Sequence, residues 1–298
     1  QVLVTMFRDD GKPLLSDPRQ VLAKVISEFN HQELVPRVAI ELEFNLFNNP
    51  KKGQSIKESL PDLAETGGNL YGLSDLDSHT KLLEDLQEAF RIQSLPYEGI
   101  LKESAPNQYE INLPFSDNAL AYCDQIIRIK RRIRAVASRF NIQACFMAKP
   151  MENQAGNGMH VHCSLLNKAG KNIFDSKTLE GVPLLERAVA GCLAFMGETF
   201  LIFAPSINAY RRFQAGNHAP THPTWGYDNR TTALRIPAGP SSATRIEHRL
   251  PGADCNPYLV VAAILSGMLM GIDKELLAPA PTEGNAWLKP QNNLTLPQ

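Results

Sequence analysis

The sequence has no long apolar run, no marked excess of charge and no paired cysteine motif, and each absence excludes a class of protein. No stretch of the 298 residues reaches the roughly 18–20 uncharged residues that a membrane span needs. The formal net charge is −1, which argues against a nucleic-acid or basic membrane-surface role.

The five cysteines are odd in number and scattered, without a Cys-x-x-Cys pair. This predicts free thiols in a reducing compartment, and the cytoplasm is the default. The chain starts at Gln1 rather than Met, so we expect it to be part of a longer protein.

Apolar residues recur at helical or strand spacing along most of the chain, without an internal repeat or low-complexity segment. Helical spacing predicts helices near residues 18–29, 74–93, 116–140, 183–200 and 257–277. Asp17-Pro18 and Asn256-Pro257 mark the starts of the first and last, and Ser116 caps the third. Strand patterns occupy residues 1–7, 37–47, 100–114, 142–147, 156–164, 230–236 and 244–250. Residues 48–73 read as a long loop. Strands separated by helices, with hairpin-like pairs, favour an α+β fold with a largely antiparallel sheet.

The stretch 156–164 opens with two glycines and then alternates strictly. One face carries His160, His162 and Ser164, and the other carries apolar side chains. We therefore expect a half-buried strand with two imidazoles and a hydroxyl on one surface. Such a row could hold a metal, meet a phosphate or simply be a polar strand face, and the stretch alone leaves all three open.

Three further predicted strands carry acidic or basic residues on one face. These residues are Glu41 and Glu43, Glu103 and Glu110, and Arg245, Glu247 and Arg249. A charged strand face usually meets water, but converging carboxylates repel one another unless they are neutralised. Oxygen-rich sites with a few imidazoles suit Mg²⁺ or Mn²⁺ rather than structural Zn²⁺. The arginines nearby are fork-shaped donors for phosphate oxygens, so the pattern predicts phosphoryl transfer from a nucleotide.

Several motifs occur together and in a fixed order along nearly the whole chain. They are Glu41-Leu42-Glu43-Phe44, Lys102-Glu103, Gln108-Tyr109-Glu110, Gly158-Met159-His160-Val161-His162, Asn208-Ala209-Tyr210-Arg211-Arg212, Asn229-Arg230-Thr231 and Arg245-Ile246-Glu247-His248-Arg249. On these residues the sequence resembles the catalytic domain of the glutamine synthetase superfamily, in its type I-like branch. The resemblance implies an α+β domain over residues 1–298, with a mostly antiparallel curved sheet and helices packed outside. It also implies that an N-terminal β-grasp domain and part of the C-terminal region lie outside this chain.

The resemblance implies a role for each matched position. One metal ion would be held by Glu43, Glu103 and Glu110, and a second, on the nucleotide phosphates, by Glu41, His160 and Glu247. The nucleotide would be contacted by Glu98, Phe115, His162, Ser164, Arg235 and Arg245. Glutamate would be bound by Gly156, Arg212 and Arg249, and Arg230 would contact the transferred phosphoryl group.

The implied reaction has two steps and uses ATP, glutamate, an amine and two to three Mg²⁺ or Mn²⁺ ions. ATP phosphorylates the glutamate γ-carboxylate, and an amine nitrogen then displaces phosphate. The family also implies self-association, as a dodecamer of two hexameric rings.

The sequence departs from ordinary glutamine synthetase at three places. His218 stands where a loop glutamate attracts ammonium, and Ala155 stands where the family often has Asn. The run Trp225-Gly226-Tyr227-Asp228-Asn229-Arg230 resembles the branch in which an amine such as putrescine or spermidine replaces ammonium. We therefore expect a γ-glutamylpolyamine synthetase-like ligase. An ammonium-using glutamine synthetase is the first alternative, and an inert superfamily member is the second. His218 could also be a loop residue without a catalytic part.

Overall fold

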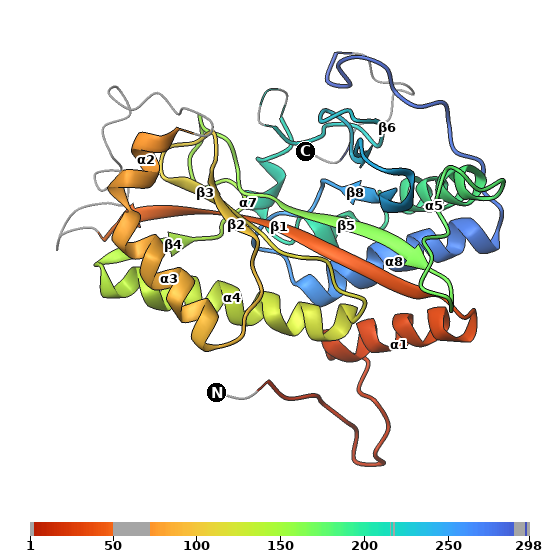
Figure 1. Ribbon diagram of the computed structural model, residues 1–298, viewed down its shortest axis with the longest axis horizontal. Helices are drawn as coiled ribbons and strands as arrows, with labels where there is room; N and C mark the ends of the chain where they lie inside the picture. Colours follow the sequence, from red (N-terminus) through yellow and green to blue (C-terminus); the bar gives the residue numbers. More distant parts are fainter. Residues whose placement is uncertain (1–2, 50–71, 215, 217, 289–295, 297–298) are drawn as a thin grey trace.

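The computed structural model describes residues 3–49, 72–214, 216, 218–288 and 296, and one mixed β-sheet forms its centre (Figure 1). Its strands are β1 (Val35–Asn48), β2 (Gly99–Lys102), β3 (Gln108–Asn112), β4 (Ile142–Cys145), β5 (Met159–Leu166), β6 (Trp225–Tyr227), β7 (Leu234–Ile236) and β8 (Ile246–His248). Their order is β2-β3-β1-β5-β8-β7-β6, and β4 pairs with β1 outside this path. Of the described pairs only β6–β7 is parallel. The predicted α+β fold with a mostly antiparallel sheet is therefore confirmed.

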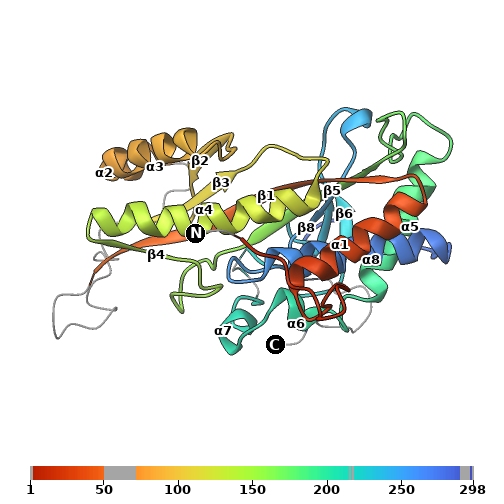
Figure 2. The same cartoon turned by 90° about the horizontal axis from the view of Figure 1, so that it is seen from below.

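The helices are α1 (Pro18–His31), α2 (Leu73–Ser78), α3 (Thr80–Ile92), α4 (Ala119–Arg139), α5 (Gly181–Ala194), α6 (Phe200–Phe203), α7 (Ile207–Tyr210) and α8 (Pro257–Asp273), with a short 3₁₀ turn at Ser241–Ala243. Figures 1 and 2 both place α1, α4 and α8 along one side of β1 and β5. Among the described residues, no helix combines the length and the apolar character that crossing a membrane requires.

The long strand β1 shows why the two sides of the sheet differ. Val38, Ile40 and Leu42 are buried in the apolar core on the helix side. Arg37, Ala39 and Glu41 alternate with them and are partly exposed. Because strand side chains alternate between faces, one pattern of residues both seals the core and presents a polar face.

Two predicted helix starts are confirmed in detail. Asp17 precedes Pro18 and its side chain accepts a hydrogen bond from the Arg19 amide. Asn256 precedes Pro257 and accepts from two amides of the first turn of α8. These side chains satisfy amides that have no partner inside the helix, and Pro at the first position loses no hydrogen bond.

Other sequence predictions about the elements are wrong. Residues 3–7 form only an isolated bridge between Phe7 and Pro13, and none of the described strands pairs with them. The N-cap of α4 is Asn118, since Ser116 instead pairs its backbone with Val38.

Three helix boundaries also differ from the prediction. The helix expected over 74–93 divides into α2 and α3 at residue 79. The one expected over 183–200 ends at Ala194, six residues before α6 begins at Phe200, and α8 ends at Asp273 rather than near residue 277. The predicted loop lies mostly within residues 50–71, outside the described residues.

Helices α5 and α8 touch through their backbones. A Cβ atom added at Gly191 would lie 2.0 Å from the carbonyl oxygen of Gly267 and 2.6 Å from the amide nitrogen of Gly271. No side chain fits there unless the helices separate, and close-packed interiors do not absorb such a shift cheaply.

We therefore expect Gly191→Ala to lower the free energy of unfolding by about 1–3 kcal/mol or more. The matched control is Gly197→Ala, because a Cβ atom there meets no atom within 4 Å. Chemical denaturation of both variants measures the effect. Equal stability of the two would contradict the close helix contact.

Candidate active site

Two adjoining cavities open on the polar side of the sheet. The larger, of about 730 Å³, is lined by Arg37, Val38, Ala39, Ile40, Glu41, Glu98, Gly99, Leu101, Asn112, Leu113, Phe115, His162, Ser164, Asn172, Ser242, Ala243 and Arg245. The smaller, of about 260 Å³, is lined by Glu41, Glu43, Leu101, Glu103, Glu110, Asn112, Gly156, His160, Arg212, His218, Arg230, Thr231, Arg235, Glu247, Arg249 and Trp287. Glu41, Leu101 and Asn112 line both, so the two cavities adjoin at these residues.

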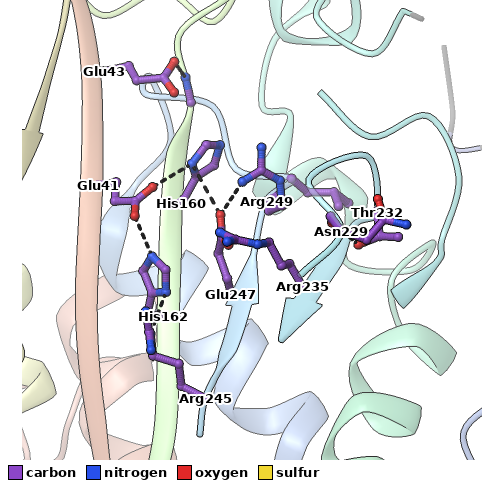
Figure 3. Close-up of polar contacts among 12 residues, drawn as sticks. Glu41, Glu43, His160, His162, Asn229, Thr232, Arg235, Arg245, Glu247 and Arg249 are labelled. Atoms are coloured by element: carbon purple, nitrogen blue, oxygen red, sulfur yellow. Dashed lines mark hydrogen bonds and ion pairs between the residues drawn. The ribbon is translucent and has the colours of Figure 1, made fainter. Parts of the chain in front are cut away.

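Strand register brings the charged side chains together. Glu41 on β1 faces His160 on β5, and Glu43 faces Glu110 on β3. Residues directly opposite on antiparallel strands are close neighbours on one face. Figure 3 shows the Glu41 carboxylate between the two imidazoles, with Oε2 3.1 Å from His160 Nδ1 and Oε1 2.9 Å from His162 Nε2.

The strand that carries these imidazoles is more buried than its alternation predicts. All eight residues of β5 are buried, so the prediction of a half-buried strand is wrong. β5 pairs with β1 on one edge and with β8 on the other. The polar face is covered because carboxylates and arginines of neighbouring elements stand over the imidazoles.

Hydrogen bonds indicate the tautomer of His162. Arg245 Nε donates to His162 Nδ1 at 3.2 Å, which leaves Nε2 to carry the proton that is donated to Glu41. Burial alone would raise the pKa of Glu41, but the hydrogen bonds from His160 and His162 outweigh it and hold that pKa below its usual range.

Glu247 on β8 is completely buried and surrounded by positive groups. Arg235 Nη1 lies 2.9 Å from its Oε2, and Arg249 Nη1 donates to its Oε1. His160 Nδ1 lies 3.8 Å from the same Oε1. Burial raises the pKa of Glu247, but the positive charge of Arg249 leads the effects that more than offset this, so the pKa lies below its usual range.

The carboxylates at the other end of the small cavity lack such compensation. Burial, together with the charges of Glu41 and Glu43, raises the pKa of Glu110 to about 9. Burial and the charge of Glu43 raise the pKa of Glu103 to about 7. These carboxyl groups are therefore held partly protonated by one another, which is the expected behaviour of clustered acids without a cation.

This donor set fits divalent cations. Among the described residues, two groups have donor atoms that lie within 4.8 Å of one another: Glu41, His162 and Glu247, and Glu41, Glu110 and His160. The buried Nε2 of His160 has no hydrogen-bond partner within the described chain. A cation would satisfy this nitrogen and would neutralise the uncompensated acids.

The two groups divide the ligands differently from the sequence prediction. The prediction placed His162 on the nucleotide and grouped Glu110 with Glu43 and Glu103. In the structure His162 and Glu110 each stand close to Glu41. All six predicted ligands line the small cavity, while His162 lines the larger one. The assignment of the six ligands to separate ions stays a prediction.

Gln108, a buried residue for which the sequence predicted no role, connects Glu43 to the backbone around Gly156. Gln108 Nε2 lies 3.2 Å from Glu43 Oε2, 2.9 Å from the Gly156 carbonyl oxygen and 3.1 Å from Asn157 Oδ1. The amide of Gly158 also donates to Glu43 Oε2, at 2.7 Å. These bonds fix one carboxylate oxygen of Glu43, and the position of Gln108 two residues before Glu110 on β3 was the available signal.

The residues predicted to bind glutamate lie together in the small cavity. Arg212 is buried and donates to the carbonyl oxygens of Leu250 at 2.7 Å and Arg249 at 3.3 Å. Gly156 packs against it so closely that a Cβ atom would lie 3.0 Å from Arg212 Cγ. His218 and Arg230 line the same cavity.

The larger cavity holds five of the six predicted nucleotide contacts: Glu98, Phe115, His162, Ser164 and Arg245. The sixth, Arg235, lines the small cavity instead. Sequence reasoning missed Arg37, whose guanidinium lies 4.4 Å from the centre of the Phe115 ring. Arg37 stands on the same face of β1 as Glu41 and Glu43, so the period-2 pattern could have identified it.

An aromatic-walled cavity that joins an acid-lined, arginine-rimmed cavity defines a site for metal-assisted chemistry on a nucleotide. Residues 15–298 match the family model of the glutamine synthetase catalytic domain. The chain belongs to this family.

Individual relatives are consistent with the family match. The chain is 40% identical over 289 residues to γ-glutamylputrescine synthetase PuuA of Escherichia coli, covering 96% of this chain and 61% of that protein. It is 34% identical to glutamate–isopropylamine ligase of a Pseudomonas species, covering 96% and 63%. A solved structure, a GmaS complex with ADP, superimposes with a TM-score of 0.85 at 27% identity, covering 97% of this chain and 67% of that one. The chain thus spans about three fifths of the length of the two curated relatives.

We expect Mg²⁺ or Mn²⁺ to raise the thermal unfolding midpoint, by the equivalent of about 2.7 kcal/mol at a hundredfold excess over Kd. Glu110→Gln removes one ligand carboxylate and should lose most of that increase. The matched control is the exposed Glu180→Gln, which should keep it. A full metal-dependent increase in Glu110→Gln would contradict the proposed ligand set.

The raised pKa of Glu110 also predicts a pH dependence when metal is removed by a chelator. Between about pH 4.5 and 9 the folded state keeps a proton on Glu110 that the unfolded state has released. The stability that this proton contributes is therefore complete at low pH and is lost as the pH rises through about 9. Lys130, whose pKa burial lowers to about 8, acts in the opposite direction. The informative quantity is therefore the difference between wild type and Glu110→Gln, measured by thermal unfolding from pH 5 to 10. The wild type should lose stability relative to Glu110→Gln as the pH rises. A difference that stays constant would contradict the raised pKa of Glu110.

Proposed function

We propose that this protein is an ATP-dependent ligase that joins the γ-carboxylate of glutamate to an amine through a γ-glutamyl phosphate. The observation that carries the proposal is the meeting of the two cavities at Glu41. An aromatic and arginine-lined space on one side suits a nucleotide. A space lined by carboxylates, His160 and four arginines on the other side suits the transfer of its terminal phosphoryl group.

Phe115 and Arg245 bind and orient the nucleotide in the large cavity, since an exposed ring and a guanidinium suit a base and its phosphates. Glu41, Glu43, Glu103, Glu110, His160 and Glu247 hold two to three Mg²⁺ or Mn²⁺ ions. When bound, these ions supply positive charge that offsets the charge on the transferring phosphoryl group.

Arginines surround the point where charge develops. Arg230 and Arg235 line the small cavity together with Glu247, and there they stabilise the transferring group electrostatically. Arg212 and Arg249, beside the backbone at Gly156, bind the charged ends of glutamate. The site thereby places the γ-carboxylate between the nucleotide and the amine.

The amine attacks as a neutral base, so its ammonium form must lose a proton. His218 lines the small cavity, and a neutral imidazole can accept that proton. A histidine does not provide the negative charge that attracts a small ammonium ion, which favours an organic amine. The names of the two curated relatives, a putrescine and an isopropylamine ligase, support the same choice.

Ammonium is the second candidate amine. The chain is also 36% identical over 281 residues to a glutamine synthetase of Pyrococcus abyssi. An inert superfamily member is disfavoured, since the side chains needed for a metal and phosphate site all line the two cavities. Assembly as a dodecamer of two hexameric rings, and a location in the cytoplasm, complete the proposal and rest on the family resemblance and on the free cysteines.

A panel of amines tests the substrate. Phosphate release with ATP, Mg²⁺ and glutamate should be faster with putrescine, spermidine or cadaverine than with ammonium at the same low concentration. The reverse order would favour the glutamine synthetase alternative.

Single substitutions test the metal ligands. His160→Ala and Glu247→Ala should each lower turnover by about 100-fold or more, since each removes a side chain proposed to bind a metal ion. The matched controls are His31→Ala and Glu28→Ala, which alter an exposed His–Glu pair on α1 and should leave turnover unchanged. Near-normal turnover in either site variant would contradict the assignment.

A further inference from the structure

A segment far from the acidic strands in sequence brings Trp287 to the wall of the small cavity. Residues 282–287, here called the strap, are held by the loop that carries Arg230. Asn229 Nδ2 donates to the carbonyl oxygens of Thr282 at 3.1 Å and Gly284 at 2.8 Å. Strand β6 adds a further bond, because the Thr282 amide donates to the Trp225 carbonyl oxygen at 2.7 Å.

The far end of the strap is held just as closely. The Ala286 amide donates to Thr231 Oγ1 at 2.9 Å, and that hydroxyl in turn donates to Asn229 Oδ1 at 2.6 Å. The residues on both sides of Arg230 therefore bind the strap. Its path is set by the same loop that places an arginine in the cavity.

The strap ends in Trp287, whose indole lines the small cavity. Its Nε1 donates to the Ala219 carbonyl oxygen at 3.0 Å, beside His218. The side chain is half-buried. The indole is thus fixed at its polar end, next to the loop residue that differs from ordinary glutamine synthetase.

An indole is unusual in this cavity. Apart from Trp287 and Leu101, the described side chains that line it are charged or polar, with one glycine. Glutamate has an ammonium group and two methylenes, but its contacts are assigned above to Gly156, Arg212 and Arg249. Phosphate and divalent ions have no use for an aromatic face. An organic ammonium does, because its cation is attracted to the ring quadrupole and its methylene groups pack on the ring.

We propose that Trp287 is a specificity residue for the second substrate and that it selects a primary alkylammonium over ammonium. The methylene chain lies on the indole, next to His218, which accepts the proton of the reacting ammonium. A bare ammonium ion has no alkyl part to pack, so it gains little from the ring. This inference rests on the proposed ligase function and adds to it the residue that reads the amine.

Steady-state phosphate release tests the role. Trp287→Ala should raise KM for 1,4-diaminobutane about tenfold, while KM for ammonium, glutamate and ATP changes by less than about twofold. Trp287→Phe, which keeps a ring but loses the bond to Ala219, should lie between. The matched control is Leu288→Ala, at the neighbouring exposed position, which should resemble wild type.

The pattern separates substrate recognition from a structural role. If the indole only anchors the strap, Phe and Ala will be equally impaired and KM will change for all substrates together. That result, or an unchanged KM for the diamine in Trp287→Ala, overturns the inference while leaving the ligase function in place.

A binding measurement covers the case in which no amine is turned over. The chain has two tryptophans, and Trp225 is 1% exposed, so the emission of half-buried Trp287 should respond to ligand. Titration with 1,4-diaminobutane in the presence of ADP and Mg²⁺ should give a saturable change that Trp287→Phe lacks. Absence of turnover refutes the proposed function, whereas absence of this change, or its persistence in Trp287→Phe, refutes the role of Trp287.

Discussion

The pairing of β1 with β3 and β5 is the constraint on which the rest of the site depends. It sets Glu41 against His160 and Glu43 against Glu110. Because strand side chains alternate, a shift of one residue in either pairing would turn the acids into the apolar core and expose Val38 and its neighbours. The helices behind the sheet therefore do more than bury apolar surface. By holding one face of β1 against the core, they hold the other face, and its carboxylates, in one place.

The paired strands hold several carboxylates close enough to repel one another. Glu110 and Glu103 have raised pKa values because burial and neighbouring carboxylates disfavour their charged forms. At the other end, Glu247 is kept charged by Arg235 and Arg249. At one end of the small cavity the carboxylates thus lack a neutralising positive charge, and at the other end arginines provide it. Such polarity suits a site that receives cations beside the acids and an anionic group beside the arginines.

The parts of this picture with a local periodic signal were predictable from sequence. The alternation along β1 and β5 identified both the strands and the residues that share a face, and Asp17 and Asn256 identified two helix starts. What failed depended on partners elsewhere in the chain. Residues 3–7 have a strand-like pattern but bridge only to Pro13, and no described strand lies beside them.

Burial and side-chain grouping also required tertiary contacts. The polar face of β5 is covered by residues from other elements, so the alternation of β5 predicted a half-buried strand where the structure has a fully buried one. The position of His162 and Glu110 beside Glu41 depends on side-chain geometry across three strands. Trp287 had no pattern to mark it, because the strap reaches the cavity only through bonds to Asn229 and Thr231.

The proposed ligase reaction requires that the γ-carboxylate of glutamate attacks the terminal phosphorus of ATP before the amine reacts. Glutamate labelled with ¹⁸O in its γ-carboxylate tests this directly, since phosphate formed during turnover with an amine can be examined by ³¹P NMR. Transfer through a γ-glutamyl phosphate predicts one labelled oxygen in each phosphate released. Unlabelled phosphate would mean that water attacks ATP at this site, and it would contradict the ligase account.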